Sequence, residues 1–141
     1  MGKILIVEDD DNRIMQFKIQ FLVYKDVIIT KSSAEAVGLV KDIKFDVIFL
    51  DHDLGICPET GDKTCRVFLK SGTGTGYEVA ESIKDSINEN TLVIIHSWNP
   101  AGANNMMKVI PNNVYAPFGT PHFNRCVAEI KNGLNLMGTY N

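Results

Sequence analysis

The chain has 141 residues, of which 45% are hydrophobic and 22% charged, and its formal net charge at pH 7 is -3. This length favours a single domain, residues 1–141, with a substantial core, and the negative charge argues against general DNA binding through a basic surface. The 3 cysteines cannot form a disulfide framework, and the apolar run at the start is too short for a signal peptide or a membrane span, so we expect a cytoplasmic protein with no membrane contact.

Short apolar segments alternate with amphipathic segments along the chain. Each apolar segment is a brief run bounded by charged, polar or glycine residues, which is typical of strands buried in a parallel sheet. The expected strands are residues 3–7, 26–30, 46–50, 91–95 and 114–116.

The segments between these strands carry helix signals. Capping boxes begin at Ser32 and Thr75, and a cap followed by proline begins at Asn99 and Thr120. The apolar residues expected on buried helix faces are Ile14, Phe17, Phe21, Val37, Val40, Val79, Ile83, Ile87, Phe123, Val127, Ile130 and Leu134. Alternation of strands and helices predicts an α/β fold, a doubly wound five-stranded parallel sheet with the flavodoxin-like order 2-1-3-4-5.

A long insert, about residues 54–74, follows the third strand and has no helical or strand period. Loops of this length are usually functional or disordered. Its glycine-rich end enters a helix at residues 74–76 (Gly74, Thr75, Gly76), which predicts either a phosphate cradle or a mobile linker. Cys57, Cys65 and His52 are residue types that bind zinc, but their spacing fits no standard zinc-ligand pattern.

Acidic residues follow two of the expected strands. Glu8 and Asp9 end the first strand, whereas Asp51 and Asp53 end the third, and the predicted order makes these strands neighbours. Like charges about 4 Å apart repel by roughly 4 kcal/mol at an effective dielectric constant near 20, so the cluster must take up protons or hold a cation. Carboxylate oxygens favour Mg²⁺ or Mn²⁺ and would repel a flavin phosphate. The alternative is that acids lie here only because loops are polar.

Polar residues at the third and fourth strand ends add candidate site groups. His52 and His96 are general acid and base, metal ligands or structural histidines, and a catalytic His96 predicts that His96→Ala abolishes turnover but leaves the thermal midpoint nearly unchanged. Ser97 either contacts a phosphate oxygen or satisfies a local backbone group. Asn99 is a helix cap or also reaches the ligand, and Trp98 either stacks on a base or is partly buried.

Residues 4–10 (Ile-Leu-Ile-Val-Glu-Asp-Asp) resemble the first strand and acidic pair of a response-regulator receiver domain, and residues 46–51 resemble its phospho-acceptor strand. The resemblance covers most of the chain in motif order. It implies that Glu8 and Asp9 hold a metal ion and that Asp51 is the phosphoryl acceptor or a metal ligand.

The resemblance extends to one further residue, shows one departure from receivers, and points to one branch of the family. Ser97 takes the position of the hydroxyl that contacts the phosphoryl group, whereas Ala116 before Pro117 stands where receivers carry lysine before proline. Residues 51–54, 74–80 and 96–106 resemble a divergent branch, the cyclic-phosphate-processing receiver domains.

Three functions remain open from the sequence. The first is an atypical receiver with a Mg²⁺-dependent site that binds or hydrolyses a cyclic phosphate, either a small molecule of the nucleotide type or an RNA end. The second is a receiver that accepts a phosphoryl group on Asp51 from a histidine kinase. The third is a pseudo-receiver that only binds another protein. For the first, the expected groups are catalytic Asp51, His52 and His96; phosphate-binding Ser97, Asn99, Gly74, Thr75 and Gly76; and metal-binding Glu8, Asp9, Asp51 and Asp53.

Overall fold

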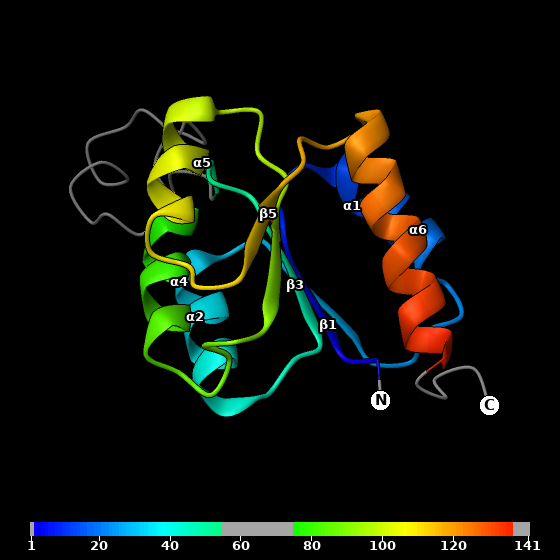
Figure 1. Cartoon of the computed structure of the whole chain (residues 1–141), viewed down its shortest axis with the longest axis horizontal. Helices are drawn as coiled ribbons and strands as arrows, with labels where there is room; N and C mark the ends of the chain where they lie inside the picture. The colour runs from blue at the N-terminus through cyan, green and yellow to red at the C-terminus, as the bar shows by residue number, and fades with distance from the viewer. Residues whose placement is uncertain (1, 55–74, 137–141) are drawn as a thin grey trace.

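The structure is a computed structural model that describes residues 2–54 and 75–136 (Figure 1). Its elements, in chain order, are β1 (Ile4–Val7), α1 (Asp11–Gln20), β2 (Val27–Thr30), α2 (Ser33–Asp42), β3 (Val47–Leu50), α4 (Gly76–Lys84), β4 (Leu92–Ile95), α5 (Pro100–Met107), β5 (Asn113–Tyr115) and α6 (Pro121–Leu136).

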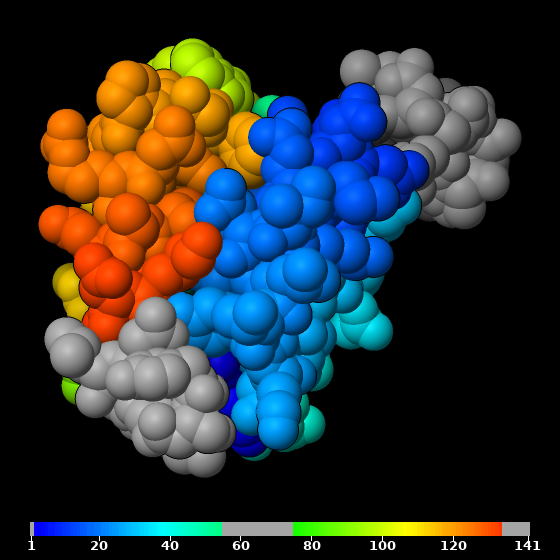
Figure 2. Space-filling model, turned by 90° about the vertical axis from the view of Figure 1, so that its right-hand side faces the viewer, coloured from blue at the N-terminus to red at the C-terminus, as the bar shows by residue number. Residues whose placement is uncertain are grey.

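The strands form one parallel sheet in the order β2-β1-β3-β4-β5, as the sequence predicts. Helices α2, α4 and α5 cover one face of the sheet, and α1 and α6 cover the other (Figure 1). Figure 2 shows α1 and α6 side by side on that second face, where the Lys131 ammonium donates to the Gln20 side chain at 3.3 Å.

The register of the three central strands aligns their carboxyl ends. Val7 pairs with Leu50, and Leu50 pairs with Ile95. The residue after each of these positions therefore lies at the same edge of the sheet, where open α/β folds place their ligands.

The two faces of the central strands divide the core between two clusters. Leu5, Val7, Ile48 and Leu50 pack toward α2, α4 and α5, whereas their chain neighbours pack toward α1 and α6. Burial of each large apolar side chain contributes roughly 1.5–3 kcal/mol. The strand ends are thus anchored in a well-packed core and hold the groups that follow them in fixed positions.

The helix signals were mostly confirmed. The Ser32 hydroxyl caps α2 by accepting the Glu35 N–H at 3.1 Å, and Ile14, Phe17, Val79 and Ile83 are buried. Of the remaining expected helix residues, the structure buries Phe21, Val40, Phe123, Val127 and Ile130.

Two expectations about α4 need correction. The capping box at Thr75 is half formed: the Thr75 backbone N–H bonds to the Glu78 carboxylate, but the Thr75 side chain makes no cap hydrogen bond. The Gly76 N–H donates to the His52 carbonyl at 2.7 Å, so the end of β3 satisfies a helix donor. Ile87 is 53% exposed, because α4 ends at Lys84 before reaching it.

Most of the insert lies outside the described residues, and so do Cys57, Cys65 and Gly74. Leu54, its first residue, is fully buried. Across residues 2–54 and 75–136, no helix is both long and apolar enough to cross a membrane.

Candidate functional site

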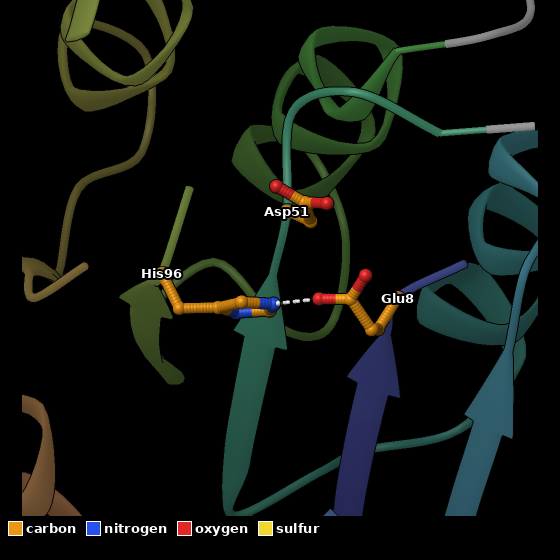
Figure 3. Close-up of side chains that lie close together, drawn as sticks. All are labelled: Glu8, Asp51 and His96. Carbon is orange, nitrogen blue, oxygen red and sulfur yellow. Dashed lines mark hydrogen bonds and ion pairs between the residues drawn. The ribbon is translucent and has the colours of Figure 1, made fainter. Parts of the chain in front are cut away.

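The ends of β1, β3 and β4 bring three polar side chains together in the protein interior. Glu8, Asp51 and His96 are exposed by only 0%, 4% and 1%, and one ligand atom from each lies within 4.8 Å of the others. Figure 3 shows the His96 ring directed at the Glu8 carboxylate, with the Asp51 carboxylate close to both. Glu8 and Asp51 therefore lie together at one edge of the sheet, as the predicted strand order implies.

The Glu8 carboxylate accepts a hydrogen bond on every side. His96 Nε2 lies 2.8 Å and Arg13 Nε 3.0 Å from Oε1. Arg13 Nη2 and the backbone N–H groups of Asp9 and Asp10 lie 3.0, 3.0 and 2.9 Å from Oε2. Burial alone would raise the pKa of Glu8, but hydrogen bonds from His96 and Arg13 outweigh it and lower the pKa to about 2. Glu8 is thus ionised, and its lone pairs are all engaged.

His96 has one polar and one apolar side. Because ionised Glu8 only accepts hydrogen bonds, His96 Nε2 must carry a proton. The ring packs among aromatic side chains, at centroid distances of 5.3 Å from Phe17 and 6.3 Å from Phe118 and Phe123. Its buried Nδ1 has no hydrogen-bond partner within the described chain. His96 therefore holds Glu8 in place. Because the ring is buried, we now expect His96→Ala to lower the stability of the protein.

Asp51 is the most available carboxylate of the cluster. Its Oδ1 accepts the His52 N–H at 2.8 Å, and its Oδ2 lies 3.6 Å from Arg13 Nη2. Burial raises the pKa of Asp51 to about 6; the His96 charge opposes the rise and the Glu8 charge adds to it. A carboxyl with this pKa exchanges its proton readily near neutral pH.

His52 is held in a defined orientation beside this cluster. Its Nδ1 lies 2.8 Å from Asp53 Oδ1, which also accepts from the Asn99 amide at 3.3 Å. The ring lies against Gly102 of α5, where an added Cβ would be 2.4 Å from His52 Cγ. A carboxylate on one ring nitrogen fixes which nitrogen carries the proton, so the structure pairs His52 with Asp53.

The remaining predicted phosphate-binding groups are used locally. The buried Ser97 hydroxyl accepts the Asn99 N–H at 3.0 Å. The Asn99 side chain caps α5 by accepting the Gly102 N–H at 3.0 Å, and Thr75 pairs with Asp53 in an isolated β-bridge. Trp98 is 63% exposed, and its indole N–H donates to the Phe118 carbonyl at 2.9 Å.

The donor set suits a hard divalent cation, which prefers carboxylate oxygens. Asp51 has the freest carboxylate, and Asp9 lies half-buried at the adjacent strand end. Glu8 fixes the backbone at Asp9 through the hydrogen bond described above. Among the described residues, the group that could hold such an ion is Glu8, Asp51 and His96, and Asp51 has the carboxylate with the fewest hydrogen bonds, since the Glu8 oxygens already accept five.

Arg13 is the site residue that the sequence interpretation missed. It lies in the first turn of α1, where the Asp10 carboxylate caps the helix by accepting the Arg13 N–H at 2.9 Å. Its guanidinium reaches back to Glu8 at the end of β1. The signal was present: a basic residue in the first turn of a helix that begins directly after an acidic strand end.

Comparison with known proteins gives the family. The model of the family described as "Cyclic-phosphate processing Receiver domain" matches residues 4–112, more than half of the chain. No curated protein matches the chain.

Solved receiver domains share the fold. The receiver domain of sensor histidine kinase PA1611 from Pseudomonas aeruginosa PAO1, with a magnesium ion coordinated in its active-site cleft, is 18% identical with a TM-score of 0.63, covering 92% of this chain and 97% of that one. Response regulator TrrA from Thermotoga maritima, in complex with Mg²⁺-BeF, is 17% identical with a TM-score of 0.62, covering 92% and 99%. The BeF3-activated DrrB receiver domain is 19% identical with a TM-score of 0.65, covering 96% and 98%.

Proposed function

Because the chain belongs to the cyclic-phosphate processing receiver domain family, we propose that it binds and hydrolyses a cyclic phosphodiester at the edge formed by β1, β3 and β4, in a reaction that depends on Mg²⁺ or Mn²⁺. The observation that carries this proposal is the convergence of Glu8, Asp51 and His96 at the ends of β1, β3 and β4, where one ligand atom of each lies within 4.8 Å of the others. A nucleotide or an RNA end supplies such a diester.

The proposed reaction uses two side chains at the rim. A water oxygen bonds to phosphorus while one of the two ring ester P–O bonds breaks. Asp51 takes the proton from the water, and His52 gives a proton to the departing oxygen, which leaves a phosphomonoester. His52 suits this role because Asp53 and Gly102 fix its ring. A divalent ion held at the cluster would supply positive charge to the phosphate oxygens.

Glu8 and His96 act as positioning residues in this proposal. Glu8 fixes the backbone at Asp9 and Asp10, and His96 fixes Glu8 from the core side. Ser97 supports the end of β4 through its bond to Asn99. None of these groups needs to touch the substrate.

A second candidate function is acceptance of a phosphoryl group on Asp51 from a histidine kinase. The supporting observation is the position of Asp51 at the end of β3 with its Oδ2 toward Arg13, in a fold shared with receivers crystallised with Mg²⁺ or BeF groups. A protein that did neither reaction would be a receiver-like interaction module.

The test presents both substrates to the same protein. A panel of ribonucleoside cyclic monophosphates and a short RNA with a cyclic phosphate end is incubated with Mg²⁺ and wild type, Asp51→Asn or His52→Gln, and the products are followed by phosphorus NMR. Parallel incubation with acetyl phosphate is read by intact mass. We expect monoester formation that both variants abolish. An acid-labile gain on Asp51 without diester hydrolysis favours the phosphoryl acceptor, and silence in both assays favours the interaction module.

A further inference from the structure

We propose that Arg13 is the cation that receives the phosphate oxygens of the ligand, an assignment that rests on the proposed function. Its guanidinium spans the two buried carboxylates: Nε and Nη2 bond to Glu8 at 3.0 Å each, and Nη2 lies 3.6 Å from Asp51 Oδ2. A phosphate approaching Asp51 therefore meets this positive charge.

The bonds to Glu8 leave part of the guanidinium available. An arginine has five N–H donors in a rigid plane, and Glu8 uses the Nε donor and one of the Nη2 donors. Within the described chain, Nη1 makes no hydrogen bond, and the side chain is 32% exposed. Arg13 is thus anchored on its buried edge and open on the other, which is the arrangement needed for bidentate contact with phosphate.

Charge balance supports the same role. A phosphate beside Asp51 brings negative charge to a site that already holds ionised Glu8, and like charges at such distances repel strongly. Among the described residues, Arg13 is the one basic side chain that forms an ion pair with Asp51. Position 116, at the end of β5, holds a buried alanine and supplies no charge. Helix α1 therefore supplies, through Arg13, a positive charge beside Asp51.

The hydrogen bonds between Arg13 and Glu8 also fix the guanidinium before a ligand binds. A guanidinium free to rotate would lose conformational entropy when it binds an anion. The paired bonds to Glu8, and the cap that Asp10 places on the Arg13 N–H, fix both ends of the residue beforehand. Glu8 is therefore the support for Arg13 as well as for Asp9.

The experiment measures binding of Mg²⁺ and of inorganic phosphate separately. Isothermal titration calorimetry is performed with Mg²⁺ alone, and then with inorganic phosphate at saturating Mg²⁺, on the full chain as wild type, Arg13→Met and Arg13→Lys. Lys31→Met is the matched control, because Lys31 is a nearby cation that pairs with Asp11 at 2.7 Å and faces Asp9, but makes no ion pair with Glu8 or Asp51 among the described residues. The double variant Glu8→Gln, Arg13→Met avoids an uncompensated buried carboxylate if the single variant is poorly folded.

We expect Arg13→Met to weaken phosphate binding at least about tenfold, since charge-assisted hydrogen bonds are lost, with Arg13→Lys intermediate and Lys31→Met unchanged. Mg²⁺ affinity should rise in Arg13→Met, because a positive charge leaves the metal's neighbourhood. A merely structural Arg13 would instead weaken Mg²⁺ binding, and that result overturns the proposal. Unchanged phosphate affinity in a folded variant refutes the role of Arg13 alone. A wild type that binds Mg²⁺ but no phosphate also overturns the assignment of Arg13, and the phosphorus NMR assay then tests the proposed function separately.

Discussion

Replacing Asp51 with asparagine should stabilise the metal-free protein in a strongly pH-dependent way. The folded protein raises the pKa of Asp51 from 3.8 to about 6, chiefly through burial. The folded state therefore binds this proton more tightly than the unfolded chain. Stability from this carboxyl is complete below pH 3.8 and is lost as pH rises toward 6.

The size of the effect follows from that rise. Each pH unit of difference corresponds to about 1.4 kcal/mol, so ionised Asp51 destabilises the fold by about 3 kcal/mol at pH 8 and by about 1 kcal/mol at pH 4.5. Asparagine keeps an oxygen for the His52 N–H and carries no charge. We expect Asp51→Asn to gain about 2 kcal/mol more, relative to wild type, at pH 8 than at pH 4.5.

The assay is urea unfolding of both proteins at several pH values between 4.5 and 8 with a metal chelator present, so that no divalent ion offsets the repulsion. Glu8 has the opposite linkage: its pKa of about 2 lies below the ordinary 4.5, so its contribution is present above pH 4.5 and is lost as pH falls. This contribution is common to both proteins and largely cancels in the difference. A stability difference that stays constant with pH, or a loss of stability on mutation at pH 8, would show that the fold does not raise the pKa of Asp51.

Other substitutions test the packing around the site. Gly102→Ala should displace the His52 ring, since the added Cβ would be 2.4 Å from its Cγ, and lower cyclic-phosphate turnover by roughly a hundredfold; normal steady-state kinetics would contradict this. Gly38→Ala on α2, where a Cβ meets nothing within 4 Å, should leave turnover intact and add roughly 0.5–1 kcal/mol of stability, and a loss in urea unfolding would show hidden strain. His96→Ala should destabilise by roughly 3–5 kcal/mol, because it empties a ring-sized space in the aromatic cluster and removes a bond to Glu8; an unchanged thermal midpoint would show that the cluster does not need the ring.

The sequence predicts the sheet and the position of the site because both depend on local patterns. A short apolar run that ends in charge marks a buried strand and its rim, and the alternation of strands and helices leaves few orders. The proximity of Glu8 and Asp51 follows from that strand order. In the structure, Val7 of β1 pairs with Leu50 of β3, and Glu8 and Asp51 are the residues that follow them.

The details that escaped prediction depend on packing between distant segments. The ring of His96 is buried by residues from α1 and from the segment around α6, and no local pattern reveals such contacts. The reach of Arg13 to Glu8 depends on the angle at which α1 leaves the strand. The prediction that Ile87 is buried was wrong for a simpler reason: the apolar spacing continues past Lys84, where α4 ends.

Hydrolysis of a cyclic phosphate at this site is tested most directly by phosphorus NMR of a ribonucleoside cyclic monophosphate incubated with the protein, with and without Mg²⁺. We expect conversion to a monoester that requires the metal and is abolished in Asp51→Asn. A diester that stays intact in the presence of folded, metal-loaded wild type across the whole substrate panel would contradict it.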